Sequence, residues 1–83
     1  MNPYAVIFTY SFDRDVAVYL FATEDEAKAF LTESYQEELR IDTEENPRDV
    51  ESEISTDRDD AKITTLFDDH EDVTEFRLGS VYL

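Results

Sequence analysis

Hydrophobic and polar residues alternate over much of the chain, a pattern typical of β-strands that bury one face. The first segment, residues 4–12, places five side chains on one face: Tyr4, Val6, Phe8, Tyr10 and Phe12. A polar turn at residues 13–15 leads to a second β-rich segment at residues 16–21. The two predicted strands hold six of the eleven aromatic residues, so we expect the core to be built around them.

The apolar positions change to helical spacing after Thr23, which predicts a helix over residues 24–40. Thr23 and Glu26 match a capping box: the Thr23 hydroxyl can accept a hydrogen bond from the Glu26 amide, and the Glu26 carboxylate can return to the Thr23 amide. Asn46-Pro47 excludes any continuation, because proline disfavours the helical conformation in the residue before it. Four side chains are expected to pack on the sheet: Phe30, Leu31, Tyr35 and Leu39.

Three more strands are predicted after the helix, at residues 50–55, 61–67 and 74–83. The first should be half-buried, and the last is expected to lie at an edge of the sheet. Gly79, the only glycine, is expected to mark a bulge or bend. The order ββαβββ predicts one α+β domain, residues 1–83, with an antiparallel sheet of four to five strands and one helix packed on a face.

The composition adds one feature to this prediction, a large negative net charge. Twenty-two acidic residues against seven basic residues give a net charge of −15, while 41% hydrophobic residues are enough for a core. Such a charge repels nucleic acid and anionic membrane, so we expect neither as a direct partner. The chain has no cysteine and no apolar run near the roughly 20 residues of a membrane-spanning helix. We therefore expect a cytoplasmic protein.

The pattern of carboxylates predicts no metal site, and we expect no other cofactor. An EF-hand frame from Asp42 to Glu53 fails because Pro47 stands where that loop needs glycine. His70, the only histidine, lies in the acidic segment DDHED at residues 68–72 without a second ligand at helix or strand spacing. We expect the neighbouring acids to raise the pKa of His70 by favouring its charged form, as a surface effect.

No residue pattern indicates catalysis. With one glycine, the chain cannot form a phosphate loop, a dinucleotide fingerprint or a nucleophile elbow in their standard forms. Catalytic carboxylate pairs need one member in an apolar pocket, and Glu38 alone lies beside the apolar stripe of the predicted helix. We interpret Glu38 as a residue at the margin of that stripe that either extends its carboxylate to solvent or pairs with Arg40 or Arg77. We expect no enzyme activity and no catalytic residue.

The clustering of acids is the strongest functional signal. Residues 42–60 contain nine acidic and two basic residues, a charge of −7. On the predicted strand, Glu51 and Glu53 point to the same side about 6.6–6.8 Å apart, a spacing of the same order as that of phosphates along a nucleic-acid strand. On the helix, Glu33 and Glu37 are four residues apart and repel each other. We interpret these carboxylates as an imitation of a polyanion.

The predicted partner is a basic protein, in particular a nuclease that binds nucleic acid. Its contact site is expected to include ten carboxylates: Glu33, Glu37, Glu51, Glu53, Asp57, Asp59, Asp60, Asp68, Asp69 and Asp72.

Small size, acidity, the lack of cysteine and the segments DTEENPRDVESEISTDRDD and DDHED together resemble a class of inhibitors encoded by phages and mobile elements. Its members include anti-CRISPR proteins and restriction inhibitors that mimic DNA. The resemblance implies that the protein inhibits a CRISPR effector nuclease or a restriction enzyme. Such an inhibitor covers the basic residues with which these enzymes contact DNA. No motif matches residue by residue, so the resemblance assigns no functional residue.

Two other functions fit the same acids. One is an immunity or adaptor-type module that binds a basic protein, such as a toxin, without nucleic-acid mimicry. The other is a structural accessory domain whose acidic face serves only solubility.

The net charge predicts that salt stabilises the fold. Fifteen excess negative charges repel one another, and at about 0.15 M salt the screening length is about 8 Å. Added sodium chloride should therefore raise the melting temperature in differential scanning calorimetry. A melting temperature that fell steadily with salt would show that attractive ion pairs dominate instead.

Overall fold

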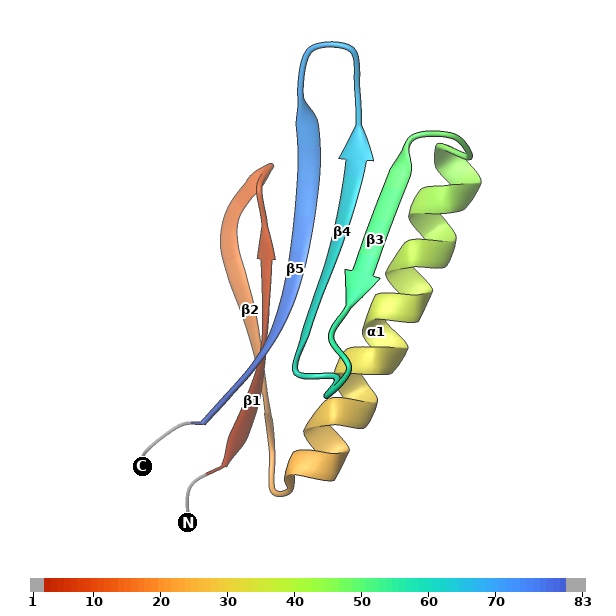
Figure 1. Cartoon of the computed structure of the whole chain (residues 1–83). Helices are drawn as coiled ribbons and strands as arrows, with labels where there is room; N and C mark the ends of the chain where they lie inside the picture. Colours follow the sequence, from red (N-terminus) through yellow and green to blue (C-terminus); the bar gives the residue numbers. More distant parts are fainter. Residues whose placement is uncertain (1–2, 81–83) are drawn as a thin grey trace.

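In the computed structural model, which describes residues 3–80, one helix lies across one face of a five-stranded antiparallel sheet (Figure 1). The strand order across the sheet is β2-β1-β5-β4-β3. This architecture confirms the predicted α+β class and the order ββαβββ. The elements in chain order are β1 (Tyr4–Tyr10), β2 (Asp13–Phe21), α1 (Glu24–Glu45), β3 (Val50–Ile54), β4 (Asp60–Leu66) and β5 (Glu71–Ser80).

The last strand lies in the middle of the sheet, so the prediction of an edge strand at 74–83 is wrong. β5 pairs with β1 on one side and with β4 on the other. Its Phe76 side chain is 2% exposed under the helix, and a strand that buries such a side chain gains most from a central position. The edges of the sheet are β2 and β3, and residues 81–83 of the predicted strand lie outside the described range.

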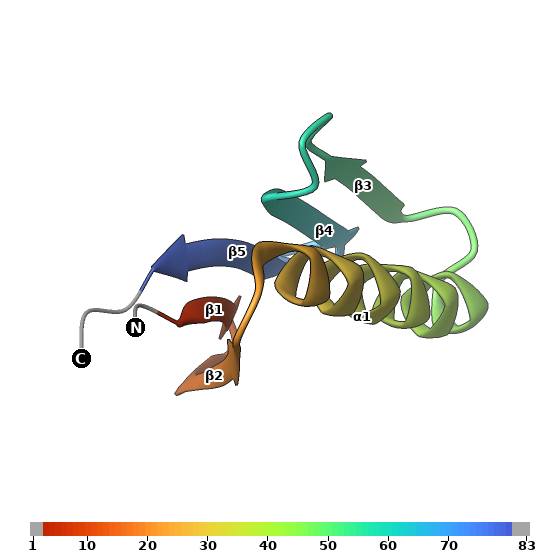
Figure 2. The same ribbon diagram turned by 90° about the horizontal axis from the view of Figure 1, so that it is seen from below.

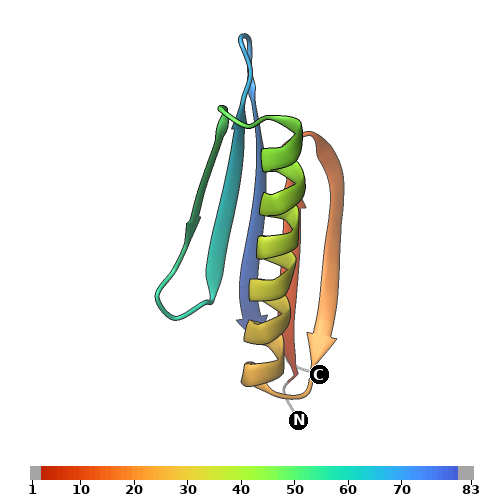
Figure 3. The same ribbon diagram turned by 90° about the vertical axis from the view of Figure 1, so that its right-hand side faces the viewer.

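The core lies between one side of α1 and the central strands. Ala27, Leu31 and Tyr35 are spaced by four residues, so they form one stripe of the helix, and all three are buried. Figure 3 shows the helix in front of the central strands, and Figure 2 shows the sheet curving around it. The sheet side of the core consists of Val6, Phe8, Ala61, Ile63 and Phe76. The predicted packing of Phe30 and Leu39 is confirmed, with both side chains partly buried.

The aromatic residues of β1 and β2 contribute to this core as predicted. The Phe8 ring meets Phe76 edge-on at 4.8 Å between centroids and stacks on Phe30 at 5.8 Å. Phe30 also contacts Tyr19 and Phe21 of β2, which brings β2 under the start of the helix. Phe12, at the β1–β2 turn, is 62% exposed and does not belong to the core.

The start of the helix follows the predicted capping box in part. The Thr23 hydroxyl accepts a hydrogen bond from the Glu26 amide at 3.2 Å, which confirms Thr23 as the N-cap. The Glu26 carboxylate accepts a bond from the Thr23 hydroxyl at 3.0 Å, whereas a bond from the Thr23 amide was expected. The cap fixes where the helix begins and therefore which side chains face the sheet.

The helix extends five residues beyond its predicted end at residue 40. Arg40 pairs with Glu44, one turn further on, and Ile41 and Asp42 are partly buried, so the extra turn still packs on the sheet. Asn46 is the C-cap, and its amide donates to the Asp42 carbonyl at 2.9 Å. Pro47 then follows, as the sequence predicts for the end of the helix.

Two local predictions about the sheet are wrong. Gly79 pairs with Ala5 in regular register, and the irregularity of β1 lies between Thr9 and Tyr10, where its pairing with β2 shifts. β3 is exposed along most of its length, and only Val50 packs against the core, because the helix lies over the strands at the centre of the sheet.

The burial of Leu31 predicts a large loss of stability when that side chain is shortened. Leu31 is fully buried, so Leu31→Ala should lower the free energy of unfolding by about 2–5 kcal/mol. Glu33→Ala on the exposed side of the same helix should change it by no more than about 0.5 kcal/mol. Urea denaturation measures both values, and equal effects of the two substitutions would contradict this packing.

Candidate functional site

The predicted contact residues fall into three groups by their elements and do not form one surface. Asp57, Asp59 and Asp60 belong to the β3–β4 turn and the start of β4, whereas Asp68, Asp69 and Asp72 belong to the β4–β5 turn and the start of β5. Successive antiparallel strands turn at opposite ends of a sheet, so the seven residues of β4 separate these groups by about 23 Å. The third group consists of the exposed glutamates of the helix and β3: Glu33, Glu37, Glu51 and Glu53.

The row on β3 is partly neutralised by its neighbours. Glu53 stands opposite Lys62 in the register of β3 and β4, and Asp60 stands opposite Arg77 of β5. These side chains line a concavity of about 410 Å³ on the sheet face away from the helix, together with Glu75. The concavity carries both signs of charge, so it is a weaker polyanion than the sequence alone suggests.

The β3–β4 turn has a fixed conformation. The Ser55 hydroxyl accepts hydrogen bonds from the amides of Asp59 and Asp60, each at 3.1 Å, and donates to an Asp59 carboxylate oxygen at 2.7 Å. Arg58 adopts a left-handed conformation with φ of 58°. The carboxylates of Asp57 and Asp59 lie near enough to Lys28 to contribute to raising its pKa, after the larger effect of its hydrogen bond to Glu24.

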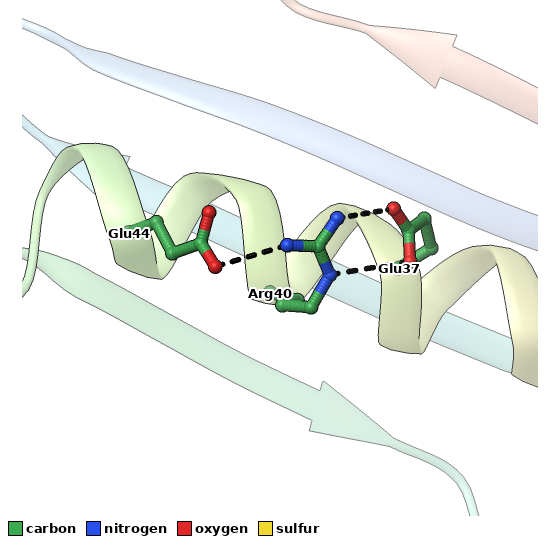
Figure 4. A network of polar contacts seen from close by, with 3 residues as sticks. All are labelled: Glu37, Arg40 and Glu44. Atoms are coloured by element: carbon green, nitrogen blue, oxygen red, sulfur yellow. Dashed lines mark hydrogen bonds and ion pairs between the residues drawn. The ribbon is translucent and has the colours of Figure 1, made fainter.

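The glutamates of the helix are also partly engaged. Arg40 binds Glu37 through two hydrogen bonds of 2.6 and 3.3 Å and reaches Glu44 at 2.9 Å (Figure 4). Hydrogen bonding to Arg40 lowers the pKa of Glu37, so this carboxylate stays charged but has an internal partner. Glu33 is exposed on the same helix.

Acidic residues outnumber basic residues where the helix ends. We call this region the acidic end. The last helical turn contains acids and no base, although the carbonyl dipoles at a helix C-terminus favour positive charge. The β4–β5 connection adds further carboxylates beside it, and of these Asp72 shares a groove with the helix. The acidic end comprises Glu38, Asp42, Glu44, Glu45, Asp68, Asp69, Glu71 and Asp72.

A groove of about 330 Å³ opens at the acidic end, between the last turns of the helix and the ends of β4 and β5. Four carboxylates border it, and they come from two separate elements: Glu38, Asp42, Glu45 and Asp72. The rest of its lining consists of three apolar side chains, two buried threonines and one amide: Phe12, Ile41, Phe67, Thr65, Thr74 and Asn46. Carboxylates beside apolar side chains suit a long basic side chain, because its stem is apolar and its head is charged.

Burial raises the pKa of Glu38 above its ordinary value, and the charge of Asp42 adds to this effect. Burial and then the charge of Glu45 raise the pKa of Asp42, with a smaller contribution from Asp72. The hydrogen bond between the two carboxyls adds to the rise in the pKa of Glu38 and opposes the rise in the pKa of Asp42. Glu38 lies at the margin of the buried stripe and is partly exposed, but its pairing with Arg40 or Arg77 is wrong, because these arginines bind Glu37, Glu44 and Glu75.

His70 behaves as predicted from its acidic neighbours. Its ring stacks on Phe67 with centroids 4.7 Å apart, and Nδ1 lies 2.6 Å from an Asp69 carboxylate oxygen. The hydrogen bond to Asp69 raises the pKa of His70, and the charges of Asp69 and Asp72 add to the rise. His70 is the histidine of an exposed turn, where it partly balances the acids on either side.

Within residues 3–80, no three histidine or carboxylate side chains are grouped closely enough to hold a metal ion. In the same range, no helix has the length and apolar character needed to cross a membrane. Comparison with models of protein families, with curated proteins and with solved structures gives no match for this chain.

Sequence reasoning missed three members of the groove: Glu38, Asp42 and Glu45. Their spacing contained the signal, because residues three and four apart share one side of a helix. The predicted helix ended at residue 40, which left Asp42 and Glu45 in a loop and hid their approach to Glu38 and Asp72.

The raised pKa of Glu38 predicts a stability that increases in mild acid. A carboxyl whose folded pKa exceeds its unfolded value destabilises the fold once it is ionised, so the penalty disappears as pH falls through the folded pKa. Glu38→Gln should therefore raise the melting temperature at neutral pH, and this gain should vanish below the ordinary glutamate pKa of about 4.3. Calorimetry across this pH range tests it, with the exposed Glu33→Gln as control; equal gains in both variants would contradict it.

Proposed function

We propose that the protein is an acidic binding protein that inhibits a basic nucleic-acid-handling enzyme, a CRISPR effector nuclease or a restriction enzyme, by occupying its polyanion site. The observation that supports this most is the acidic end, where Glu38, Asp42, Glu45 and Asp72 converge on one groove. The arrangement opposes folding, because it sets like charges together at the negative end of a helix dipole. A partner that supplies cations would turn this unfavourable arrangement into binding energy.

The contact surface in this proposal is the acidic end first and the β3 row second. Basic side chains of the partner enter the groove, where an arginine or lysine stem lies on Ile41 and Phe67 and its charge meets Asp42 and Asp72. Glu51, whose partner across the sheet is Thr64, adds negative charge on the sheet face away from the helix. Complementary charge of this kind mainly accelerates encounter, so binding should be fast and weakened by salt.

An immunity or adaptor-type module is the second candidate. The apolar side chains in the groove favour it, since they suit the stem of a lysine or arginine of any basic protein and do not themselves imitate nucleic acid. The two functions differ in one measurable property: only the mimic competes with DNA for its target.

The proposal predicts which neutralised surface loses inhibition. Asp42→Asn/Glu45→Gln should weaken inhibition of DNA cleavage by roughly 30-fold or more, because removing one partner of a buried charge pair costs about 2 kcal/mol or more. Glu51→Gln/Glu53→Gln should weaken it less, because Lys62 already balances Glu53. The control Glu24→Gln/Asp25→Asn removes the same charge at the start of the helix, about 33 Å away, and should have little effect.

The assays use purified targets: a Cas9-type effector loaded with guide RNA, and a restriction endonuclease. DNA cleavage and DNA binding are measured against increasing concentrations of each variant, and circular dichroism shows that every variant is folded. Equal inhibition by the groove variant and the unaltered protein would place the contact elsewhere. A complex that contains target, DNA and this protein together would exclude mimicry and favour the adaptor-type module.

A further inference from the structure

The edge strand β2 contains a run of uncharged residues along an open edge of the sheet. β2 pairs with β1, and in the described part of the chain no strand lies along its other side. Residues 16–21 read VAVYLF and contain no charged side chain, although 35% of the residues in the chain are charged. Ala17, Tyr19 and Phe21 of this segment stand opposite core residues of β1 and face the helix.

The alternate side chains of β2 face away from the helix and are exposed. Val16 is 56% exposed, Val18 is 54% exposed and Leu20 is 56% exposed. They lie beside Thr9, Ile7 and Ala5 of β1 in the sheet register. This side of β2 is therefore an apolar surface that continues to an open strand edge.

The two edges of the sheet differ in how they are protected. Natural edge strands commonly carry charged residues that prevent another chain from pairing with them. β3 has this protection, because its exposed Glu51 and Glu53 would meet like charges in a second β3. β2 has no charged residue between Val16 and Phe21. Another strand can therefore pair with this edge of the sheet, whereas the glutamates of β3 oppose such pairing at the other edge.

We propose that two copies of this protein associate through antiparallel pairing of β2 with β2 of a second copy, centred on Val18. In this register Val18 stands opposite Val18 of the second copy, Val16 opposite Leu20, and Ala17 opposite Tyr19. Every one of these cross-strand pairs is uncharged. A twofold interface must be complementary to itself, and the palindrome-like pattern of VAVYL meets that condition.

The lack of charge at this edge favours a second copy of the chain over a basic partner. A basic partner would find no carboxylate between residues 16 and 21, whereas a second copy brings the same uncharged strand. The exposed glutamates of β3 lie four strands away from β2, about 19 Å across the sheet, which exceeds the screening length of about 8 Å at physiological salt. The pairing also stops at two copies, because both outer edges of the resulting ten-stranded sheet are β3.

The first test measures the mass of the purified protein by light scattering and sedimentation over a range of concentrations. The unaltered chain should have the mass of two chains, and Val18→Lys should shift it to one, because two lysines would stand opposite each other. Ile54→Lys is the matched control: Ile54 is 37% exposed on the other edge strand, and this variant should remain a dimer. Added salt should favour the dimer, because it screens the repulsion between two negative chains, whereas it should weaken binding to a basic target. The salt dependence therefore tests the dimer separately from the proposed inhibition of a basic enzyme.

The second test fixes the register and does not depend on the folding of Val18→Lys. The chain has no cysteine, so a single introduced thiol can cross-link only with its own counterpart. Val18→Cys should form a disulfide between two copies on mild oxidation, because Cα atoms of directly opposed residues lie about 4.5–5.5 Å apart. Val16→Cys should not, because its counterpart lies about 13–14 Å along the strands.

The proposal is overturned by a mass of one chain for the unaltered protein at every concentration, or by assemblies that grow beyond two chains. It is also overturned if Val18→Lys remains a dimer, if Ile54→Lys dissociates as Val18→Lys does, or if Val16→Cys cross-links as readily as Val18→Cys.

Discussion

The structure depends on the packing of one side of one helix against the middle of the sheet. Leu31 and Tyr35 belong there to one buried cluster with Phe8, Ile63 and Phe76, in a chain of 83 residues. A domain of this size has a small core, so nearly all remaining side chains must stay in contact with water. That constraint places the excess of carboxylates at the surface and leaves one face of the sheet without a cover.

The carboxylates differ in the number of basic side chains that the fold places beside them. Arg40 neutralises part of the middle of the helix, and Lys62 and Arg77 do the same on the open face of the sheet. At the acidic end Asp42 and Asp72 line one groove that has no lysine or arginine in its lining, and His70 lies 3.6 Å from Asp72. Net charge therefore makes the whole molecule acidic, but pairing within the fold decides which acids are available to a basic partner.

The two edges of the sheet give the molecule two kinds of surface. β3 and the acidic end are negative and suit an oppositely charged protein, while residues 16–21 of β2 are uncharged and suit a second copy. β2 and β3 are the opposite edges of the sheet, so a dimer formed through β2 would leave β3 of both copies accessible and present it twice. Two linked sites on one target or on two would raise the overall affinity without any new contact.

The sequence by itself determined which elements form, because each one follows from local chemistry. Period-two alternation predicts the strands, the Thr23 cap sets the start of the helix, and Pro47 prevents the helix from continuing beyond it. It also determined the class of the fold and the sign of the surface. Only the tertiary structure decided which strand is central, since strand order depends on contacts between distant segments. The same holds for the groove, where Glu38 and Asp72 become neighbours because the helix runs along the sheet to the β4–β5 turn.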